Sequence, residues 1–172
     1  IKPDNLIVYY NDYDLSTDTW CRLEWTNDRI LNSQVKLADF GMSRQIGHQL
    51  AMTVTGTPLY QSPECLRSMG HDCSTDIWSV GMVLLELLLK INLKIQNKNY
   101  SESLLISTLD KHRQKLVNEE TNKSERLKIY SSLVHDNHDE LLCNLVFECL
   151  EYYPDGRISA QNVVDLIENR DS

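Results

Sequence analysis

Long hydrophobic runs are missing from this sequence. The longest apolar stretch, Ile77–Leu89, is interrupted by Glu86 and is shorter than the roughly 20 residues that a membrane-crossing helix needs. Residues 1–10 carry charges and a proline, whereas a signal peptide needs an uninterrupted apolar core there. The sequence therefore predicts neither a membrane span nor a signal peptide.

Positive charge is also scarce. The chain has 17 Lys and Arg against 25 Asp and Glu, a formal net charge of -8 and a pI of about 5.0. Such a chain repels a phosphate backbone, so we expect no nucleic-acid partner. The hydrophobic share of 41% over 172 residues is ordinary for a globular domain with a core of its own.

The cysteines lack the spacing of a disulfide framework or a zinc module. There are five, with no C-x-x-C pair: Cys21, Cys65, Cys73, Cys143 and Cys149. An odd, scattered set favours reduced thiols and an intracellular, cytoplasmic protein. His135 and His138 lie in a polar stretch without further metal-ligand residues at suitable spacing, so we interpret them as solvated.

Two short runs of β-branched and aromatic residues, 6–9 and 35–38, predict a pair of strands. The connection Asn11–Gln34 is far longer than the roughly 2–5 residues of an ordinary hairpin loop. Its polar composition favours disorder, whereas Trp20 and Trp25 favour docking on the domain surface or on a partner. Both interpretations stay open.

The rest of the chain is predicted to form helices. Residues 77–89 are apolar nearly all round after a capping sequence at 74–76, which predicts a buried helix. We expect short helices at 101–109 and 124–134 and an amphipathic helix within 138–153. After a turn at 154–156, Ser159 is expected to cap a last helix with a buried stripe formed by Val163, Val164, Leu166 and Ile167. No repeat or domain boundary is visible.

Three motifs occur in a fixed order: Ile-Lys-Pro-Asp-Asn-Leu at 1–6, Ala-Asp-Phe-Gly at 38–41 and Gly-Thr-Pro-Leu-Tyr-Gln-Ser-Pro-Glu at 56–64. Together they resemble the C-terminal lobe of a eukaryotic protein kinase of the Ser/Thr type. The resemblance implies an α+β fold over residues 1–172, mostly α-helical, with a small β-hairpin at the active-site edge.

The same resemblance assigns catalytic roles. Asp39 and Asn5 would supply hard oxygen ligands to Mg²⁺, and with Lys2 they would bind ATP. Lys2 would stabilise charge on the transferred phosphoryl group. Thr57 would bond the catalytic aspartate and lysine, which favours Ser or Thr as acceptor. Without the flanking motifs, Asp39 would be interpreted as a turn residue before a glycine.

Other residues take supporting roles by resemblance. Gly41 would turn the chain through backbone angles closed to other residues, with Phe40 packed inward. Glu64 would pair with Arg157 in a buried two-pronged contact. Asp76 would accept backbone hydrogen bonds beneath the catalytic loop.

The segment between the second and third motifs suggests regulation and specificity. Thr53 and Thr55 are candidate activation-loop phosphorylation sites, with Thr53 favoured, for an upstream activating kinase. Met42 suggests a preference for serine over threonine as acceptor.

We therefore predict a protein kinase that transfers the γ-phosphate of Mg²⁺-ATP to Ser or Thr hydroxyls of a protein substrate. The catalytic aspartate that the resemblance places before Ile1, the glycine-rich loop and the ATP-anchoring lysine are not in this sequence. We expect the isolated chain to be nearly inactive. The alternatives are a pseudokinase that serves as a protein-interaction scaffold and a truncated gene product.

Overall fold

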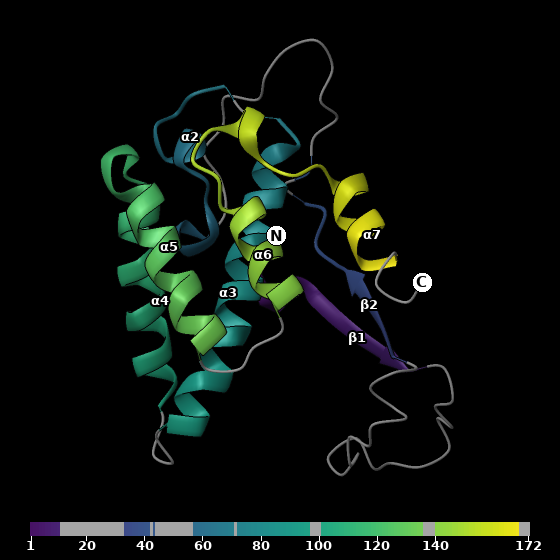
Figure 1. The fold of residues 1–172 in the computed structure, drawn as a ribbon. Helices are drawn as coiled ribbons and strands as arrows, with labels where there is room; N and C mark the ends of the chain where they lie inside the picture. The colour runs from purple at the N-terminus through teal and green to yellow at the C-terminus, as the bar shows by residue number, and fades with distance from the viewer. Residues whose placement is uncertain are drawn as a thin grey trace. The chain divides into compact units, whose positions relative to one another are not determined.

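The computed structural model describes residues 1–10, 33–41, 43, 57–70, 72–96, 101–135 and 140–168 (Figure 1). The chain divides into two compact units, the hairpin unit, Pro3–Gly41, and the helical unit, Ile1–Lys2 with Met42–Ser172. The fold class is α+β, with helices predominating over a single two-stranded sheet in the described residues.

The hairpin unit contains the two predicted strands. A 3-10 turn, η1 (Pro3–Asn5), leads into β1 (Leu6–Tyr10), which pairs antiparallel with β2 (Ser33–Leu37). The register sets Leu6 opposite Leu37, and the Ala38 N–H donates to the Asn5 carbonyl at 2.8 Å. The strand prediction is confirmed, although β2 begins two residues earlier than expected. Residues 11–32 of the long connection, with Trp20 and Trp25, lie outside the described residues.

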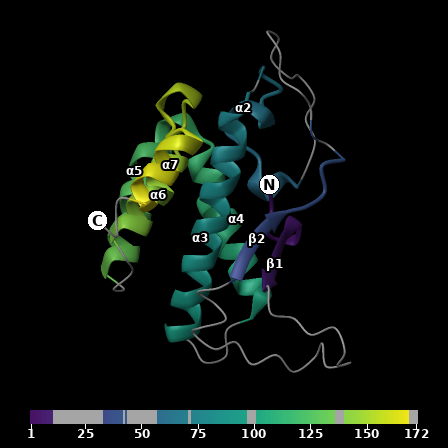
Figure 2. The same ribbon diagram turned by 90° about the vertical axis from the view of Figure 1, so that its right-hand side faces the viewer.

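Among the described residues, the helices of at least four residues all belong to the helical unit. Its elements are η2 (Pro58–Tyr60), α2 (Pro63–Leu66), α3 (Ser74–Gln96), α4 (Glu102–Leu116), α5 (Glu119–His135), α6 (Glu140–Cys149), η3 (Pro154–Gly156) and α7 (Ala160–Glu168). Helix α3 packs against α4 and α6, and α5 packs against the same two helices, as Figures 1 and 2 show. The core of the unit lies among these four helices.

Helix α3 supplies the largest part of this core. Trp78, Met82 and Leu85 are fully buried. The prediction that the helix is buried on every side is wrong, since Leu87 is 52% and Ile91 46% exposed. Within the described residues α4 and α6 cover only part of its circumference.

The contact between α3 and α6 depends on Gly81. A Cβ atom at this position would lie 2.7 Å from Cys149 Cβ and 2.9 Å from Leu150 Cγ, closer than real side chains approach. Both partners are buried, so they have little room to move. The missing side chain of Gly81 therefore allows the two helix backbones to come together.

We expect Gly81→Ala to lower the free energy of unfolding by about 1–3 kcal/mol, as overpacking typically does, although alanine favours helices by up to about 1 kcal/mol. Urea unfolding followed by circular dichroism measures the change. Lys90→Ala, at an exposed position of the same helix, is the control and should stay within about 0.5 kcal/mol. A Gly81→Ala protein as stable as the parent would contradict the close contact.

The last helix begins as predicted but does not bury its apolar residues. The Asn162 N–H donates to Ser159 Oγ at 3.1 Å, which confirms the cap. The predicted buried stripe is wrong: Val164, Leu166 and Ile167 are 44%, 42% and 51% exposed. Among the described residues α7 makes no extensive contact with another helix. No described helix has the length and hydropathy required to cross a membrane.

Candidate functional site

Asn5 and Asp39 lie at the same end of the hairpin. Asn5 directly precedes β1, and Asp39 follows the last residue of β2 by two positions. The hydrogen bond from the Ala38 N–H to the Asn5 carbonyl extends the strand ladder by one pair. The antiparallel register therefore brings these two sequence-predicted residues together, although they are 34 positions apart in the chain.

The backbone turns sharply at Asp39. Its φ is 60°, in the left-handed region where asparagine and aspartate are enriched among non-glycine residues. Asp39 Oδ1 accepts a hydrogen bond from the Gly41 N–H at 3.3 Å. The prediction that Gly41 adopts the unusual backbone angle is wrong, because Gly41 has no φ in that region. The turn is made by the aspartate, whose own side chain bonds the backbone two residues on.

Phe40 does not pack inward as predicted. Its side chain is 64% exposed. The described part of the hairpin unit is a single two-stranded layer, and Ile7, Val8, Val35 and Leu37 are also between 41% and 63% exposed. A two-stranded sheet alone has no second layer that could bury an aromatic ring.

The donor set at the hairpin end fits Mg²⁺. Asp39 offers an exposed carboxylate, and Asn5 offers a neutral amide oxygen. Mg²⁺ prefers oxygen ligands and usually takes only one or two protein carboxylates, with water and phosphate oxygens completing its shell. The described residues contain no group of three or more His, Cys, Asp and Glu that could hold a metal ion.

In the helical unit, Glu64 and Arg157 form a buried ion pair, as predicted. Arg157 Nη1 lies 2.6 Å from Glu64 Oε1, and Nη2 lies 2.6 Å from Oε2. The Arg157 side chain is 0% exposed and the Glu64 side chain is 5% exposed. Burial alone would raise the pKa of Glu64, but hydrogen bonds, chiefly from Arg157, more than offset burial and hold this pKa below its usual value.

Arg157 also ties together the backbone around the pair. Its Nε donates to the Glu151 carbonyl at 2.8 Å, Nη1 to Ser74 at 3.2 Å and Nη2 to Tyr152 at 3.1 Å. Its guanidinium carbon lies 5.2 Å from the centre of the Trp78 ring. The pair therefore joins α2, the start of α3 and the segment after α6.

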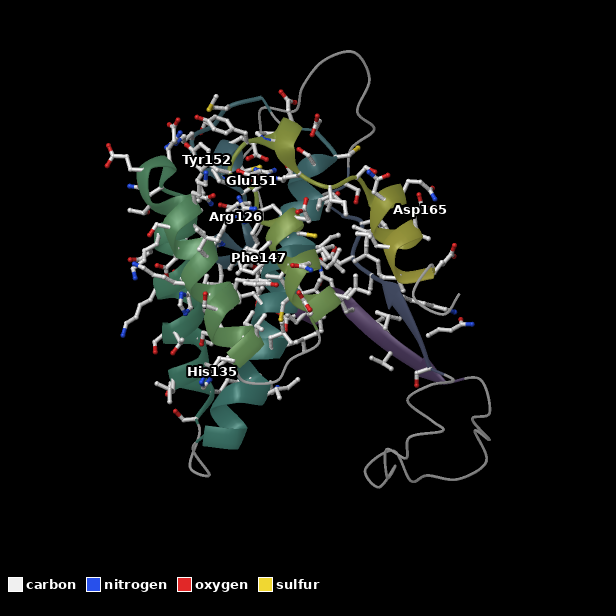
Figure 3. The ribbon with its side chains drawn as sticks, in the orientation of Figure 1. Arg126, His135, Phe147, Glu151, Tyr152 and Asp165 are labelled. Carbon is white, nitrogen blue, oxygen red and sulfur yellow. The ribbon has the colours of Figure 1, made fainter. Side chains whose placement is uncertain are left out.

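Figure 3 shows Arg126 of α5 directed at this same segment. Arg126 forms an ion pair with Glu151 and donates to the Phe147 carbonyl at 3.0 Å. The Arg126 guanidinium lies 5.9 Å from the Phe147 ring centre. Arg126 of α5 therefore binds the carboxylate of Glu151, and Arg157 binds its backbone carbonyl.

The segment that carries Thr57 is fixed to α3. The Tyr60 hydroxyl donates to Glu86 Oε2 at 2.7 Å, and Ser79 Oγ donates to the Tyr60 carbonyl at 2.9 Å. Thr57 itself is exposed at the start of η2. These bonds position η2 beside α4, where the two elements line an open hollow of about 720 Å³, which we call the η2–α4 groove.

The remaining predicted residues divide between the units. Lys2 is partly buried and belongs, with Thr57, to the helical unit, whereas Asn5 and Asp39 belong to the hairpin unit. The side chain of Asp76 is 66% exposed, and its Oδ1 lies 3.9 Å from the Ile1 amino nitrogen. The resemblance places most of the loop whose backbone N–H groups would bond this carboxylate before Ile1, so this role of Asp76 stays a prediction. Met42, Thr53 and Thr55 lie outside the described residues.

The groove and the residues that position it were not predicted from the sequence. The groove is positioned by hydrogen bonds between elements, which Tyr60, Ser79 and Glu86 make. No short sequence motif predicts such bonds. Glu102 and Ile106, which line the groove from α4, lie in a region that was assigned only as a short helix. The sequence feature that could have indicated where α4 begins was the capping serine, Ser101, whose Oγ accepts a hydrogen bond from the Leu104 N–H.

Comparison with known proteins identifies the family. Residues 1–166 match the family described as Protein kinase domain. A probable serine/threonine-protein kinase of Dictyostelium discoideum is 31% identical over 139 residues, 80% of this chain and 13% of the relative. Serine/threonine-protein kinase ATG1 of Mycosarcoma maydis is 41% identical over 88 residues (51% and 8%). Serine/threonine-protein kinase Nek11 of Mus musculus is 43% identical over 67 residues (38% and 11%). The matches span about a tenth of these relatives' lengths.

Proposed function

This chain belongs to the protein kinase domain family, and from that membership we propose that it forms the metal-binding and acceptor-binding part of a serine/threonine-protein kinase. The reaction is transfer of the γ-phosphate of ATP to a Ser or Thr hydroxyl of a protein substrate. The relatives named as serine/threonine-protein kinases support this class of acceptor.

The observation that carries the proposal is the placement of Asn5 and Asp39 at one end of the hairpin. Asp39 supplies a carboxylate oriented by the Gly41 N–H, and Asn5 supplies an amide on a backbone fixed by Ala38. These two residues would hold Mg²⁺, which neutralises charge on the phosphate oxygens of ATP when it is bound.

Lys2 and Thr57 complete the proposed set of catalytic residues. The Lys2 ammonium would stabilise negative charge on the transferred phosphoryl group, and the Thr57 hydroxyl would orient the catalytic groups beside the acceptor. The support for both roles is their position in the motifs that resemble the family. Phosphorylation of Thr53 or Thr55 by an upstream kinase, and an intracellular location, belong to the same proposal.

The test uses the protein that carries this chain at the length in which its cell makes it, the natural-length protein. With γ-labelled ATP, Mg²⁺ and a mixed protein substrate, we expect label in phosphoserine and phosphothreonine. Chelation of Mg²⁺ should abolish the transfer, and excess Mg²⁺ should restore it. Label in phosphotyrosine alone, or transfer unaffected by chelation, would contradict the proposal. Absence of any transfer would favour the scaffold alternative.

A further inference from the structure

The guanidinium of Arg157 has no spare donor. An arginine side chain carries five N–H groups in a rigid fork. In Arg157 they meet both carboxylate oxygens of Glu64 and the carbonyls of Ser74, Glu151 and Tyr152. Because the Arg157 side chain is 0% exposed, water cannot take the place of an acceptor that moves. The position of the segment after α6 therefore helps to fix the guanidinium and, with it, the Glu64 carboxylate.

One peptide group of this segment is held at both ends. The carbonyl of the Glu151–Tyr152 peptide accepts from Arg157 Nε at 2.8 Å. The N–H of the same peptide belongs to Tyr152 and donates to Glu151 Oε1 at 3.1 Å. A peptide group is planar, so a rotation that moves its N–H also moves its carbonyl. The Glu151 carboxylate therefore sets the direction of the carbonyl that binds Arg157.

Arg126 of α5 holds this carboxylate from the other side. Its Nη1 pairs with Glu151 Oε2, and its Nη2 donates to the Phe147 carbonyl at 3.0 Å (Figure 3). The Arg126 side chain is 17% exposed and that of Glu151 is 28% exposed, so solvent screens this pair less than a surface pair. A Cβ atom at Gly156 would lie 2.7 Å from Glu151 Cγ. The missing side chain of Gly156 therefore leaves room for Glu151 to lie in this direction.

At the other end, Arg157 holds the segment next to the proposed acceptor site. Glu64 lies in α2, which begins three positions after η2 ends, and Thr57 directly precedes η2. The Glu64 carboxylate also accepts from Thr75 Oγ1 of α3 at 3.1 Å. A shift of Arg157 therefore displaces Glu64 and the segment that follows Thr57. The contacts form a continuous chain, which we call the α5–α2 relay: Arg126, Glu151, Arg157 and Glu64.

We propose that Arg126 is a positioning residue, which orients the Glu151 carboxylate, holds Arg157 against Glu64 and thereby orients the segment that contacts the protein substrate. This inference rests on the proposed function, because the acceptor-binding role of that segment belongs to it. Arg126 acts through Glu151 and Arg157 and takes no direct part in the reaction.

Hydrogen–deuterium exchange of the natural-length protein, followed by mass spectrometry, tests the relay without ATP. The N–H groups of residues 66–69 and of residues 156–158 are bonded to nearby carbonyls. In Arg126→Met both segments should exchange about tenfold faster than in the parent, the factor expected when a hydrogen bond to a charged group is lost. In the part of the chain that the structure describes, Arg126 is linked to 66–69 through Arg157, so faster exchange there reports the relay.

Two variants separate the orientation of Glu151 from a general loss of stability. Arg126→Lys keeps a cation beside the Glu151 carboxylate and should restore the parent's exchange at 66–69. Lys128→Met removes a positive charge from an exposed position of the same helix and should leave this exchange unchanged. Residues 160–168 of α7 are the internal reference, and their exchange should equal the parent's in every variant.

Kinetics of phosphate transfer measure the acceptor side. Arg126→Met should raise the KM for a protein substrate about tenfold. The KM for ATP should stay unchanged, because the proposed metal ligands Asn5 and Asp39 belong to the hairpin unit. A protein that is only less stable would instead lose kcat with its folded fraction and keep both KM values.

Unchanged exchange at 66–69 in Arg126→Met, or an equal rise in every segment including α7, would overturn the inference. An unchanged KM for the protein substrate in an active enzyme would overturn it as well. A parent protein that transfers no phosphate would refute the proposed function, and exchange at 66–69 would then decide the relay by itself. The failures of the two proposals can therefore be told apart.

Discussion

Replacing Arg157 by methionine is expected to lower the free energy of unfolding by about 3–5 kcal/mol, the usual cost of removing one partner from a buried ion pair. The Glu64 carboxylate, whose side chain is 5% exposed, would lose the two 2.6 Å hydrogen bonds that offset its burial. The carbonyls of Ser74, Glu151 and Tyr152 would lose donors as well. Urea unfolding followed by circular dichroism measures the loss.

Two variants show whether the cost comes from the unpaired charge. Lys128→Met removes a positive charge from an exposed position of α5 and should change stability by less than about 0.5 kcal/mol. The double variant with Glu64→Leu and Arg157→Met should be more stable than Arg157→Met alone, because no buried charge remains unpaired. An Arg157→Met protein that loses less than about 1 kcal/mol would show that the pair contributes no more than an exposed one.

The pair should also make stability depend on pH. Burial raises the pKa of Glu64, but the hydrogen bonds, led by those from Arg157, hold it below the usual value of 4.5. A carboxyl with a lowered pKa stabilises the fold above its unfolded pKa, and the contribution is lost as the pH falls through the folded pKa. The parent should therefore lose stability below about pH 4.5, and Arg157→Met should lose less over the same range.

The Glu64–Arg157 pair illustrates what the sequence could predict. The two residues are 93 positions apart, so neither periodicity nor local propensity connects them. The prediction came from the resemblance of the flanking motifs to a family. The two strands and α3 were recognisable from local composition, because β-branched runs and a continuous apolar run are strong patterns.

Helix α5 shows why other parts could not be predicted. Two of its buried positions are polar: Asn122 donates to the Leu116 carbonyl at 2.7 Å, and Glu125 accepts from His112 and Lys115. Leu127, by contrast, is 60% exposed. A pattern based on hydrophobicity cannot identify a helix whose buried side chains are satisfied by hydrogen bonds to another element.

The candidate site could likewise be predicted only in part. Asn5 and Asp39 were named from motifs, and the register of the hairpin brings them to one end. The backbone angle of Asp39 was not foreseen, since aspartate and glycine can both occupy a left-handed turn position. The η2–α4 groove had little signal in the sequence beyond the capping Ser101, because its lining depends on η2 lying beside α4.

Asp39→Asn is expected to reduce phosphate transfer by roughly a thousandfold, a loss of the size seen when electrostatic stabilisation of a transition state is removed. Asparagine keeps an oxygen that can accept from the Gly41 N–H and tolerates a φ of 60°. The substitution therefore leaves the turn intact and removes only the negative charge that would face Mg²⁺. The fold should be unchanged by circular dichroism.

Asp165→Asn is the matched control. Asp165 is exposed on α7, where its Oδ1 accepts from Gln161 at 2.9 Å, and asparagine can accept the same bond. The control removes one carboxylate charge from a residue with no proposed part in the reaction. Its rate of phosphate transfer should equal that of the parent.

The most direct measurement is the initial rate of phosphate transfer from γ-labelled ATP by the natural-length protein, by its Asp39→Asn variant and by the Asp165→Asn control, over a range of Mg²⁺ concentrations. We predict a Mg²⁺-dependent rate for the parent and the control, and a rate about a thousandfold lower for Asp39→Asn that added Mg²⁺ does not restore. Equal rates for all three proteins would contradict the assignment of the hairpin end as the metal site.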